Sequence, residues 1–334
     1  MTEKLSYEKS GVSISSGDAW VEVIKGLLKK RPKNANTLGS VGGFVGLYSI
    51  GGGQCIAACC DGVGTKLELA KKTGIYQELG QDLVAMNVND LVTIGARPLF
   101  FLDYIACGKL DVNVLKEIVT GVLNACEESL CALLGGETAE MPGVYSPDGF
   151  DLAGFSVGIV DEDDIIDGKK IKKDNLILGL ESSGAHSNGY SLVRSALGKD
   201  GLNIDLKSTP KGWKETVEEA AMRPTKLYVK AALEAVKTGK INGMAHITGG
   251  GMYANIVRIV PKELDVKIDF SSWKRPKIFD LIQSAGIAEN EMRNVFNLGI
   301  GYIFIIDKAD LKKVTAALSK AGEKPIIIGT VTKR

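Results

Sequence analysis

Histidine is scarce in this chain, since only His186 and His246 occur among 334 residues. The six cysteines have no CxxC spacing, and this shortage of paired sulfur and nitrogen ligands argues against a zinc site. The thiols lie in apolar or helical stretches, where cysteine packs as a small hydrophobe. We therefore expect reduced cysteines and a cytoplasmic protein. The six are Cys55, Cys59, Cys60, Cys107, Cys126 and Cys131.

Long apolar runs are also lacking, because no stretch approaches 18 consecutive apolar residues. The N-terminal residues 1–4 do not begin an apolar signal segment, so we expect neither export nor a membrane span. The formal net charge is +1, which gives no electrostatic footprint for nucleic acid or for an anionic membrane. The length is typical of two globular domains, each with its own core.

Glycine, by contrast, is abundant at 40 residues and is clustered rather than periodic. One cluster lies in residues 60–66, Cys-Asp-Gly-Val-Gly-Thr-Lys, after an apolar run at residues 55–60 that predicts a buried strand. Gly62 and Gly64 would let backbone N–H groups approach a phosphate, and Thr65 and Lys66 add donors. Asp61 offers an oxygen ligand suited to Mg²⁺. Taken alone, the stretch is weak evidence, because such a sequence is more often an ordinary turn.

Three more acidic residues lie in apolar or glycine-rich surroundings. Residues 83–92 predict a helix buried on nearly all sides, and Asp90 on it requires a partner or a cation. Asp103 interrupts an apolar strand predicted at 97–106, and Glu137 follows two glycines at the end of a strand predicted at 131–134. With Asp61, these groups indicate a site for Mg²⁺ and a nucleotide. The spacing matches neither a Walker A loop nor a dinucleotide fingerprint.

Lys25 has two interpretations. It lies in an amphipathic stretch at residues 19–28, where a surface lysine with a snorkelling side chain is the simpler interpretation. The alternative is a mobile lysine that covers a triphosphate together with the glycine-rich loop at residues 40–44, which contains Gly42 and Gly43.

The pattern changes near residue 168 to alternating strands and helices, which predicts a second domain of the α/β layer type. We therefore divide the chain into domains at 1–168 and 169–334. The expected strands are 175–180, 241–246, 266–270, 297–306 and 325–331. The expected helices are 187–197, 217–237 with a break at Arg223-Pro224, 252–259, 277–285 and 308–321.

Both histidines open loops that resemble anion sites in this second half. Residues 186–189, His-Ser-Asn-Gly, and residues 246–251, His-Ile-Thr-Gly-Gly-Gly, each follow a predicted strand and precede a predicted helix. A histidine beside a loop is often only a structural hydrogen-bonding group. Because both occur at such loops, we expect a substrate with a phosphate of its own, separate from the nucleotide.

These motifs resemble those of a known superfamily of ATP-dependent enzymes, which contains aminoimidazole ribonucleotide synthetases, selenophosphate synthetases and thiamine phosphate kinases. The heptad at 60–66 resembles the superfamily signature. Further motifs are similar to those of the aminoimidazole ribonucleotide synthetases, also called phosphoribosylformylglycinamidine cyclo-ligases, over residues 7–330. These motifs are Asn89-Asp90-Leu91 and the stretches at 98–104, 135–143, 186–194 and 246–251.

The resemblance implies ring closure of formylglycinamidine ribonucleotide with ATP to give aminoimidazole ribonucleotide, ADP and phosphate. It also implies an α/β fold of two domains and a homodimer whose N-terminal sheets join into a shared β-barrel. ATP and Mg²⁺ are the implied cosubstrate and metal. The alternatives are another phosphotransferase of the superfamily and a catalytically silent nucleotide-binding scaffold. A silent scaffold would be expected to have lost acidic or lysine positions, and Lys25, Asp61, Lys66 and Asp90 are all present.

The resemblance also implies roles for individual residues. The catalytic candidates are His246, His186 and Lys25, and the metal ligands are Asp61, Asp90 and Asp103. ATP would be bound by Lys25, Gly42, Gly43, Asp61, Gly62, Gly64, Thr65, Lys66, Asp90 and Glu137. The substrate would be held by Ser187, Asn188, Gly189, Thr248, Gly249, Gly250 and Gly251.

Overall fold

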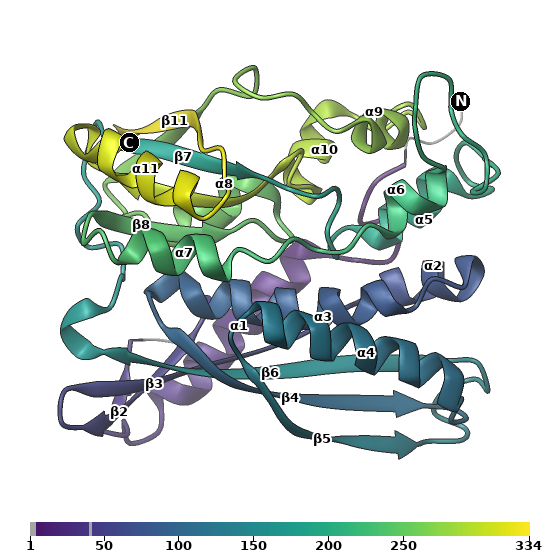
Figure 1. Cartoon of the computed structure of the whole chain (residues 1–334), viewed down its shortest axis with the longest axis horizontal. Helices are drawn as coiled ribbons and strands as arrows, with labels where there is room; N and C mark the ends of the chain where they lie inside the picture. The colour runs from purple at the N-terminus through teal and green to yellow at the C-terminus, as the bar shows by residue number, and fades with distance from the viewer. Residues whose placement is uncertain (1–4, 40–41) are drawn as a thin grey trace.

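The computed structural model describes residues 5–39 and 42–334 and contains two separate sheets. Ser40 and Val41 of the predicted glycine-rich loop, and residues 1–4, lie outside the described part of the chain. Figure 1 shows the first sheet on one side of the molecule and the second sheet on the other, with helices between them. The mixed α/β class predicted from the sequence is confirmed.

The first sheet has six strands in the order β1-β2-β3-β6-β4-β5, and all its pairings are antiparallel except the parallel pair β4–β5. Helices α3 and α4 lie along one face of this sheet (Figure 1). The strands are β1 Thr37–Leu38, β2 Gly46–Gly51, β3 Gln54–Gly62, β4 Arg97–Cys107, β5 Ala132–Glu140 and β6 Phe150–Asp161. The helices of this half are α1 Ile14–Lys29, α2 Lys66–Thr73, α3 Gln77–Leu91 and α4 Val112–Glu128.

The second sheet has five antiparallel strands in the order β8-β10-β7-β11-β9. They are β7 Leu176–Glu181, β8 Ile241–His246, β9 Leu264–Ile268, β10 Ile300–Ile306 and β11 Ile326–Lys333. The helices are α5 Tyr190–Leu197, α6 Val217–Met222, α7 Val229–Val236, α8 Gly251–Val257, α9 Lys277–Gln283, α10 Glu289–Val295 and α11 Leu311–Lys320. The predicted boundary at 168/169 lies between the two sheets and stays a prediction.

Some elements differ from the sequence-based expectation. Strand β5 continues through the two glycines to Glu140, because parallel pairing with β4 supplies the backbone partners there. The break expected at Arg223-Pro224 extends to Tyr228, so the predicted helix 217–237 is two short helices. The sequence patterns did not reveal β1, β2 or α10, which are short and lack clear apolar periodicity.

The two halves share one apolar core. This cluster joins residues of α2 and α3, such as Leu67 and Leu83, to residues of the second half, such as Leu178, Tyr190 and Ala220. Helices α2, α3 and α4 therefore form a layer between the first sheet and helices α5, α6 and α7 (Figure 1). The boundary between the halves is consequently well packed, and polar side chains that occur in it require specific partners.

The other face of the first sheet is apolar and partly exposed. In β6, Leu152, Gly154 and Ser156 face the helices, whereas Phe155 and Ile159 alternate with them and face outward. Tyr48 and Ile50 of β2 are exposed in the same alternating manner. No helix among the described residues is long and apolar enough to cross a membrane.

Candidate functional site

Asp61 and Asp90 bring two carboxylates together where β3 meets α3. Asp61 is near the end of β3 and faces α3, and Asp90 is on the last turn of that helix. Burial, followed by the negative charge of Asp90, raises the pKa of the Asp61 carboxyl to about 6, partly opposed by a hydrogen bond from the Gly62 N–H at 2.8 Å. Two carboxylates kept close in a partly buried place are typical of a cation site.

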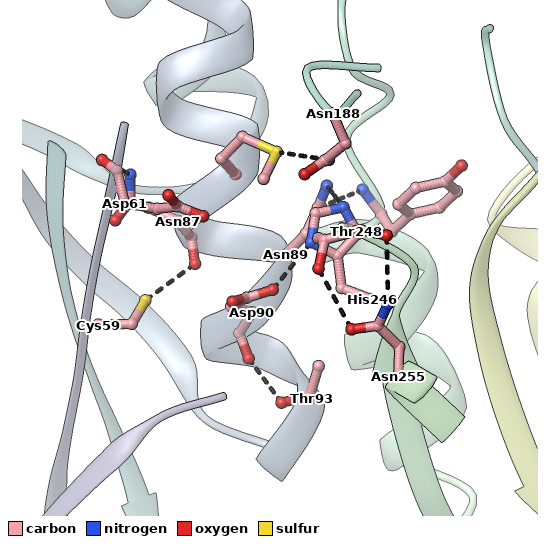
Figure 2. Close-up of polar contacts among 12 residues, drawn as sticks. Cys59, Asp61, Asn87, Asn89, Asp90, Thr93, Asn188, His246, Thr248 and Asn255 are labelled. Atoms are coloured by element: carbon pink, nitrogen blue, oxygen red, sulfur yellow. Dashed lines mark hydrogen bonds and ion pairs between the residues drawn. The ribbon is translucent and has the colours of Figure 1, made fainter. Parts of the chain in front are cut away.

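His246 connects this acidic pair to the second sheet. It ends β8, and its Nδ1 lies 2.8 Å from Asp90 Oδ1 (Figure 2). Its Nε2 lies 3.5 Å from the side-chain nitrogen of Asn89, and the ring is completely buried. Both ring nitrogens are thus engaged within the protein. These contacts favour a role in orienting Asp90 over the acid–base role predicted for His246.

Two asparagines on α3 complete the framework around the acidic pair. The Asn87 side chain donates to the Asp61 carbonyl at 3.2 Å, and its own side-chain oxygen is buried without a hydrogen-bond partner. Asn89 accepts from the Tyr228 N–H at 2.8 Å and donates to the Lys226 carbonyl at 2.9 Å. The sequence analysis predicted no role for either asparagine, although Asn89 belongs to the motif Asn89-Asp90-Leu91. Both are amides on an otherwise apolar buried helix.

The two histidine-bearing loops meet at Asn188. Its side-chain oxygen accepts from the Gly249 N–H at 2.9 Å. Its side-chain nitrogen approaches the Met86 sulfur on α3 at 3.6 Å (Figure 2). The structure therefore brings together the two loops predicted to hold the substrate. It also shows that the Gly249 N–H is occupied by Asn188 and is not free for a phosphate in this arrangement.

Asn255 determines the shape of the glycine-rich turn at 248–251. Its buried amide nitrogen donates to the carbonyls of Thr248, Gly249 and Gly251 at 3.2, 3.2 and 2.7 Å. Its oxygen accepts from the Thr248 hydroxyl at 3.2 Å. Gly251 has a φ of +70°, and a Cβ there would lie 1.9 Å from the Arg293 carbonyl oxygen, so the turn requires glycine at that position. Asn255 was not identified from the sequence.

His186 and Ser187 face inward instead of lining an open surface. His186 is completely buried, and its Nδ1 has no hydrogen-bond partner. Burial, reinforced by nearby positive charges of His246, Lys66 and Lys226, holds its pKa well below the usual value for histidine, so the ring is neutral. The Ser187 hydroxyl donates to the Val63 carbonyl at 2.7 Å. Gly189, with φ +75°, begins α5.

The turn after Asp61 is only partly available to a ligand. Gly64 has φ +73°, and there is open space where a side chain would be. The Thr65 hydroxyl, however, lies 3.1 Å from that of Ser191 on α5. A Cβ on Gly62 would lie 2.8 Å from the Leu152 carbonyl oxygen, so glycine there permits close pairing of β3 with β6. Of this turn, Gly64 best fits the predicted approach to a phosphate.

Lys66 does not lie where the sequence pattern predicts. It is completely buried, and its ammonium lies 2.6 Å from Asp82 Oδ2 and donates to the carbonyls of His186 and Arg223, each at 2.9 Å. Two of its N–H donors go to these carbonyls, and Asp82 supplies the opposite charge. Its position does not support the predicted contact with ATP. The reason is that Asp82 and the two carbonyls, distant in sequence, converge on it.

Lys25 and Gly42 lie close together. This is required by the hypothesis that Lys25 and the glycine-rich loop cover a triphosphate together. A Cβ on Gly42 would lie 3.3 Å from Lys25 Cε. Lys25 forms an exposed ion pair with Glu22 at 2.7 Å. A Cβ on Gly43 would contact only the Val45 carbonyl oxygen, at 3.9 Å. Phe44, the next residue, packs against the core of the second sheet and under Arg258. Residues 42–44 thus approach Lys25 through Gly42 and the second half through Phe44.

Asp103 and Glu137 are not gathered with Asp61. Asp61 and Asp103 flank the same residue of β6, Gly154, from opposite sides, and the Phe101 ring and the Asn87 amide fill the space over it. Burial raises the pKa of Asp103. Glu137 pairs with Tyr104, one residue out of phase with Asp103, so it projects from the opposite face of the sheet. Neither position supports the predicted role at the nucleotide.

Asp61 and Asp90 suit a Mg²⁺ ion whose other ligands are phosphate oxygens of a nucleotide. Among residues 5–39 and 42–334, no group of three or more His, Cys, Asp or Glu side chains is arranged to hold a metal ion. Mg²⁺ commonly uses only one or two carboxylates and completes its shell with phosphates and water. A cation between Asp61 and Asp90 would relieve the repulsion that raises the Asp61 pKa. Asp61 and Asp90 therefore remain candidates.

Comparison with known proteins identifies the family. Two family descriptions match, AIR synthase related protein, N-terminal domain, over residues 42–160, and the corresponding C-terminal domain over 172–334. The chain is 46% identical to the phosphoribosylformylglycinamidine cyclo-ligase of Bacillus pumilus over 98% of this chain and 96% of that protein. The Neisseria gonorrhoeae cyclo-ligase is also 46% identical, over 100% and 97%. The chain belongs to the phosphoribosylformylglycinamidine cyclo-ligase family.

The cyclo-ligase family assignment agrees with the resemblance drawn from the motifs. The fold is also similar to that of AaThiL, solved in complex with AMPPCP and TMP, with a TM-score of 0.67, 14% identity and coverage of 97% of this chain and 93% of that one. At this identity the likeness concerns the fold alone. The likeness agrees with the α/β class seen in the two sheets.

Proposed function

We propose that this chain catalyses the ATP-dependent ring closure of formylglycinamidine ribonucleotide to 5-aminoimidazole ribonucleotide, releasing ADP and phosphate. The observation that carries the proposal is the 46% identity to cyclo-ligases along nearly the full length of both chains. The complex of AaThiL with AMPPCP, a protein of the same fold, supports ATP as the cosubstrate.

The proposed chemistry has two steps. The formyl oxygen of the substrate attacks the γ-phosphorus of ATP and ADP leaves. The amidine nitrogen then attacks the carbon bearing the phosphorylated oxygen, the ring closes, and the C–O bond breaks to release phosphate. Phosphoryl transfer depends mainly on positioning and charge neutralisation, and the site offers residues for both.

We assign the nucleotide to the side of the site formed by β3 and α3. Asp61 and Asp90 would hold Mg²⁺, which neutralises charge on the triphosphate when bound. Gly64 would approach the phosphates, and Lys25 with Gly42 and Gly43 would cover them. Lys66, Asp103 and Glu137 are left out of this assignment because of where their side chains lie.

We assign the second substrate to the loops at 186–189 and 248–251, which Asn188 joins through Gly249. His246 orients Asp90 and does not exchange a proton with the substrate. We assign the acid–base role to His186, which is as buried as His246 and accepts from the Ser183 N–H at 3.4 Å, but whose Nδ1 has no hydrogen-bond partner.

We further infer a cytoplasmic homodimer. All six cysteines are free, which suits a reducing compartment. The outward face of the first sheet has partly exposed apolar residues on several strands, among them Tyr48, Ile50 and Phe155. Such a face is typical of a surface that pairs with a second copy, and joining two of these sheets would form the expected barrel.

The decisive assay follows ATP consumption with and without formylglycinamidine ribonucleotide, together with formation of aminoimidazole ribonucleotide. We expect ring product and ADP in equal amounts. ADP without ring product would favour another phosphotransferase of the superfamily, and absence of both would favour a silent scaffold. In either case the assignment is incorrect.

Asp90→Asn tests the site itself. The substitution keeps the shape of the side chain but removes the charge, so we expect Mg²⁺-dependent turnover to fall by at least 100-fold with the fold retained. Asp280→Asn, an exposed aspartate on α9, is the matched control and should keep full activity. Near-normal turnover of Asp90→Asn would contradict the ligand role.

A further inference from the structure

Lys66 and Asp82 form a fully buried ion pair at the junction of the two halves. Both side chains have no solvent exposure, and the ammonium lies 2.6 Å from the carboxylate. Removing two charges from water is costly, and attraction between them compensates only when their remaining hydrogen-bonding capacity is also satisfied. The groups that hydrogen-bond to Lys66 and to the other Asp82 oxygen indicate what the pair does.

All of those further partners belong to the second half of the chain. Lys66 donates to the carbonyls of His186 and Arg223, and the ring of Tyr190 lies 5.2 Å from its ammonium. Asp82 accepts from both the backbone N–H and the hydroxyl of Thr225, at 2.8 and 2.6 Å. The pair therefore holds two separate segments of the second half against α2 and α3.

The residues just before Lys66 hold the same histidine-bearing loop. The Val63 carbonyl accepts from the Ser187 hydroxyl at 2.7 Å, and Thr65 shares a hydrogen bond with Ser191 at 3.1 Å. Residues 63–66 thus contact His186, Ser187 and Ser191 through three hydrogen bonds. We call this set of contacts, with Asp82, the 63–66 clasp.

The loop at 186–191, which the 63–66 clasp contacts, includes a residue with an unfavourable backbone conformation. His186 has a φ of +62°, a region that residues other than glycine rarely adopt. Its carbonyl accepts from Lys66, and its ring packs where any side chain on Gly301 would clash. A non-glycine residue keeps a positive φ only where surrounding contacts hold it there. The 63–66 clasp provides such contacts for His186.

The second held segment supports the other side of the site. Residues 223–228 begin at the Arg223 carbonyl bonded to Lys66, continue through Thr225 bonded to Asp82, and end at Tyr228, whose N–H donates to Asn89. Asn89 in turn contacts His246, the partner of Asp90.

We propose that Lys66, with Asp82 as its charge partner, is a positioning residue that holds the 186–191 loop in the geometry that binds the ribonucleotide substrate. In this proposal the motif at 60–66 has two functions: Asp61 faces the nucleotide, and residues 63–66 hold the loop that receives the other substrate. The inference rests on the proposed function for its kinetic consequences, but the structural part can be tested without it.

Lys66→Met alone would leave Asp82 charged and buried without its partner, and could destabilise the whole protein. The informative variant is therefore the double substitution Lys66→Met with Asp82→Asn. It removes both charges and keeps the Asp82 side-chain oxygen that accepts from Thr225, while the His186 and Arg223 carbonyls lose the ammonium. Lys71→Met is the matched control, because Lys71 lies on the same helix and forms partly exposed ion pairs with Glu68 at 2.8 Å and Asp148 at 3.9 Å, both within the first half.

For the double variant, assayed well below its unfolding temperature, we expect the KM for formylglycinamidine ribonucleotide to rise at least tenfold and the KM for ATP to change less than twofold. The control should match the unmodified protein in both. A rise confined to the KM for ATP would place Lys66 at the triphosphate, and unchanged KM values would show that the pair only stabilises the fold. Either result overturns the proposal.

A ligand-free measurement separates this inference from the proposed function. The chain has only two histidines, so ¹⁵N spectra of the imidazole rings report on His186 and His246 directly. We expect the His186 ring signals to shift and broaden in the double variant and to stay unchanged in Lys71→Met. An unchanged His186 in the folded double variant would refute the clasp, whatever reaction the enzyme catalyses.

Discussion

At the scale of single residues, Asp61 is a carboxyl group whose ionised form is disfavoured in the folded protein. Its folded-state pKa of about 6 lies above the unfolded value near 3.8, because of burial first and the Asp90 charge second. Between these values the folded protein keeps a proton that the unfolded chain has released. Stability contributed by this group is therefore present at low pH and is lost as pH rises through that window.

Asp61→Asn is accordingly expected to abolish Mg²⁺-dependent activity and to stabilise the metal-free fold. The gain is at most about 3 kcal/mol above pH 6, from a shift of roughly two pKa units. Thermal unfolding of both proteins without metal between pH 4 and pH 8 measures it. The melting temperatures should converge near pH 4, and a variant that is less stable at pH 8 would contradict the charge argument.

His246 gives a second test at this scale. Asparagine can present a donor where Nδ1 lies, whereas glutamine mimics Nε2. If His246 only orients Asp90, His246→Asn should lose less activity than His246→Gln, whose loss we expect to be about 10–100-fold, as for residues that orient metal ligands. Steady-state rates at several Mg²⁺ concentrations would show the difference. Equal losses in both variants would favour direct proton transfer by His246.

At the scale of elements, the position of α3 depends on two glycines. A Cβ on Gly80 of α3 would lie 2.1 Å from the Ile118 carbonyl oxygen, and one on Gly121 of α4 would lie 2.0 Å from the Gln77 carbonyl oxygen. The helices therefore touch backbone to backbone. Since α3 presents Asn87, Asn89 and Asp90 to the site, this contact sets the position of the acidic pair relative to the second half.

Gly121→Ala should consequently destabilise the protein by about 3 kcal/mol, the upper part of the usual range for overpacking, because backbone atoms cannot move aside as side chains do. Differential scanning calorimetry would measure the loss. Gly26→Ala on α1 is the control, because open space surrounds that position and alanine favours a helix by about 1 kcal/mol. Similar melting temperatures for the two variants would exclude a tight α3–α4 contact.

At the scale of the whole molecule, the most notable surface is the outward face of the first sheet, which has partly exposed apolar residues. Strand register places Phe155 of β6 between Cys60 of β3 and Leu102 of β4, so the outward face is apolar across three adjacent strands. The proposed homodimer would bury this face.

Phe155→Glu places a charge in the centre of that face and should convert a dimer into a monomer, as measured by sedimentation velocity. Phe155 is 41% exposed in the single chain, and Ile327 of β11 is similar at 46% but belongs to the second sheet. Ile327→Glu is therefore the control and should leave the mass unchanged. A monomeric unmodified protein, or a dimeric Phe155→Glu variant, would contradict the proposed interface.

Much of the fold follows from local pattern alone. Apolar runs and their length predicted β3, β4, β7 and β8 to within a few residues, and the nearly all-apolar stretch at 83–92 predicted a buried helix. The same local signals placed Asp61 at the end of a strand and Asp90 on that helix. The motifs, read in order, also indicated the family, because short runs of adjacent residues retain family identity.

What the sequence could not decide was which distant groups would meet. Lys66 was predicted at a phosphate from its neighbours in the chain, but its partners are Asp82 and the carbonyls of residues 120 and 157 positions away. Asn255 gave no signal, and the motif that contains Asn89 gave no indication of its partners, for the same reason. Asp103 and Glu137 lie on paired strands but project from opposite faces of the sheet. Periodicity along the chain records which residues are buried, whereas hydrogen bonds between packed elements depend on three-dimensional position. The sequence by itself therefore determined the family and the acidic pair, and only the tertiary structure decided that Lys66 joins the two halves.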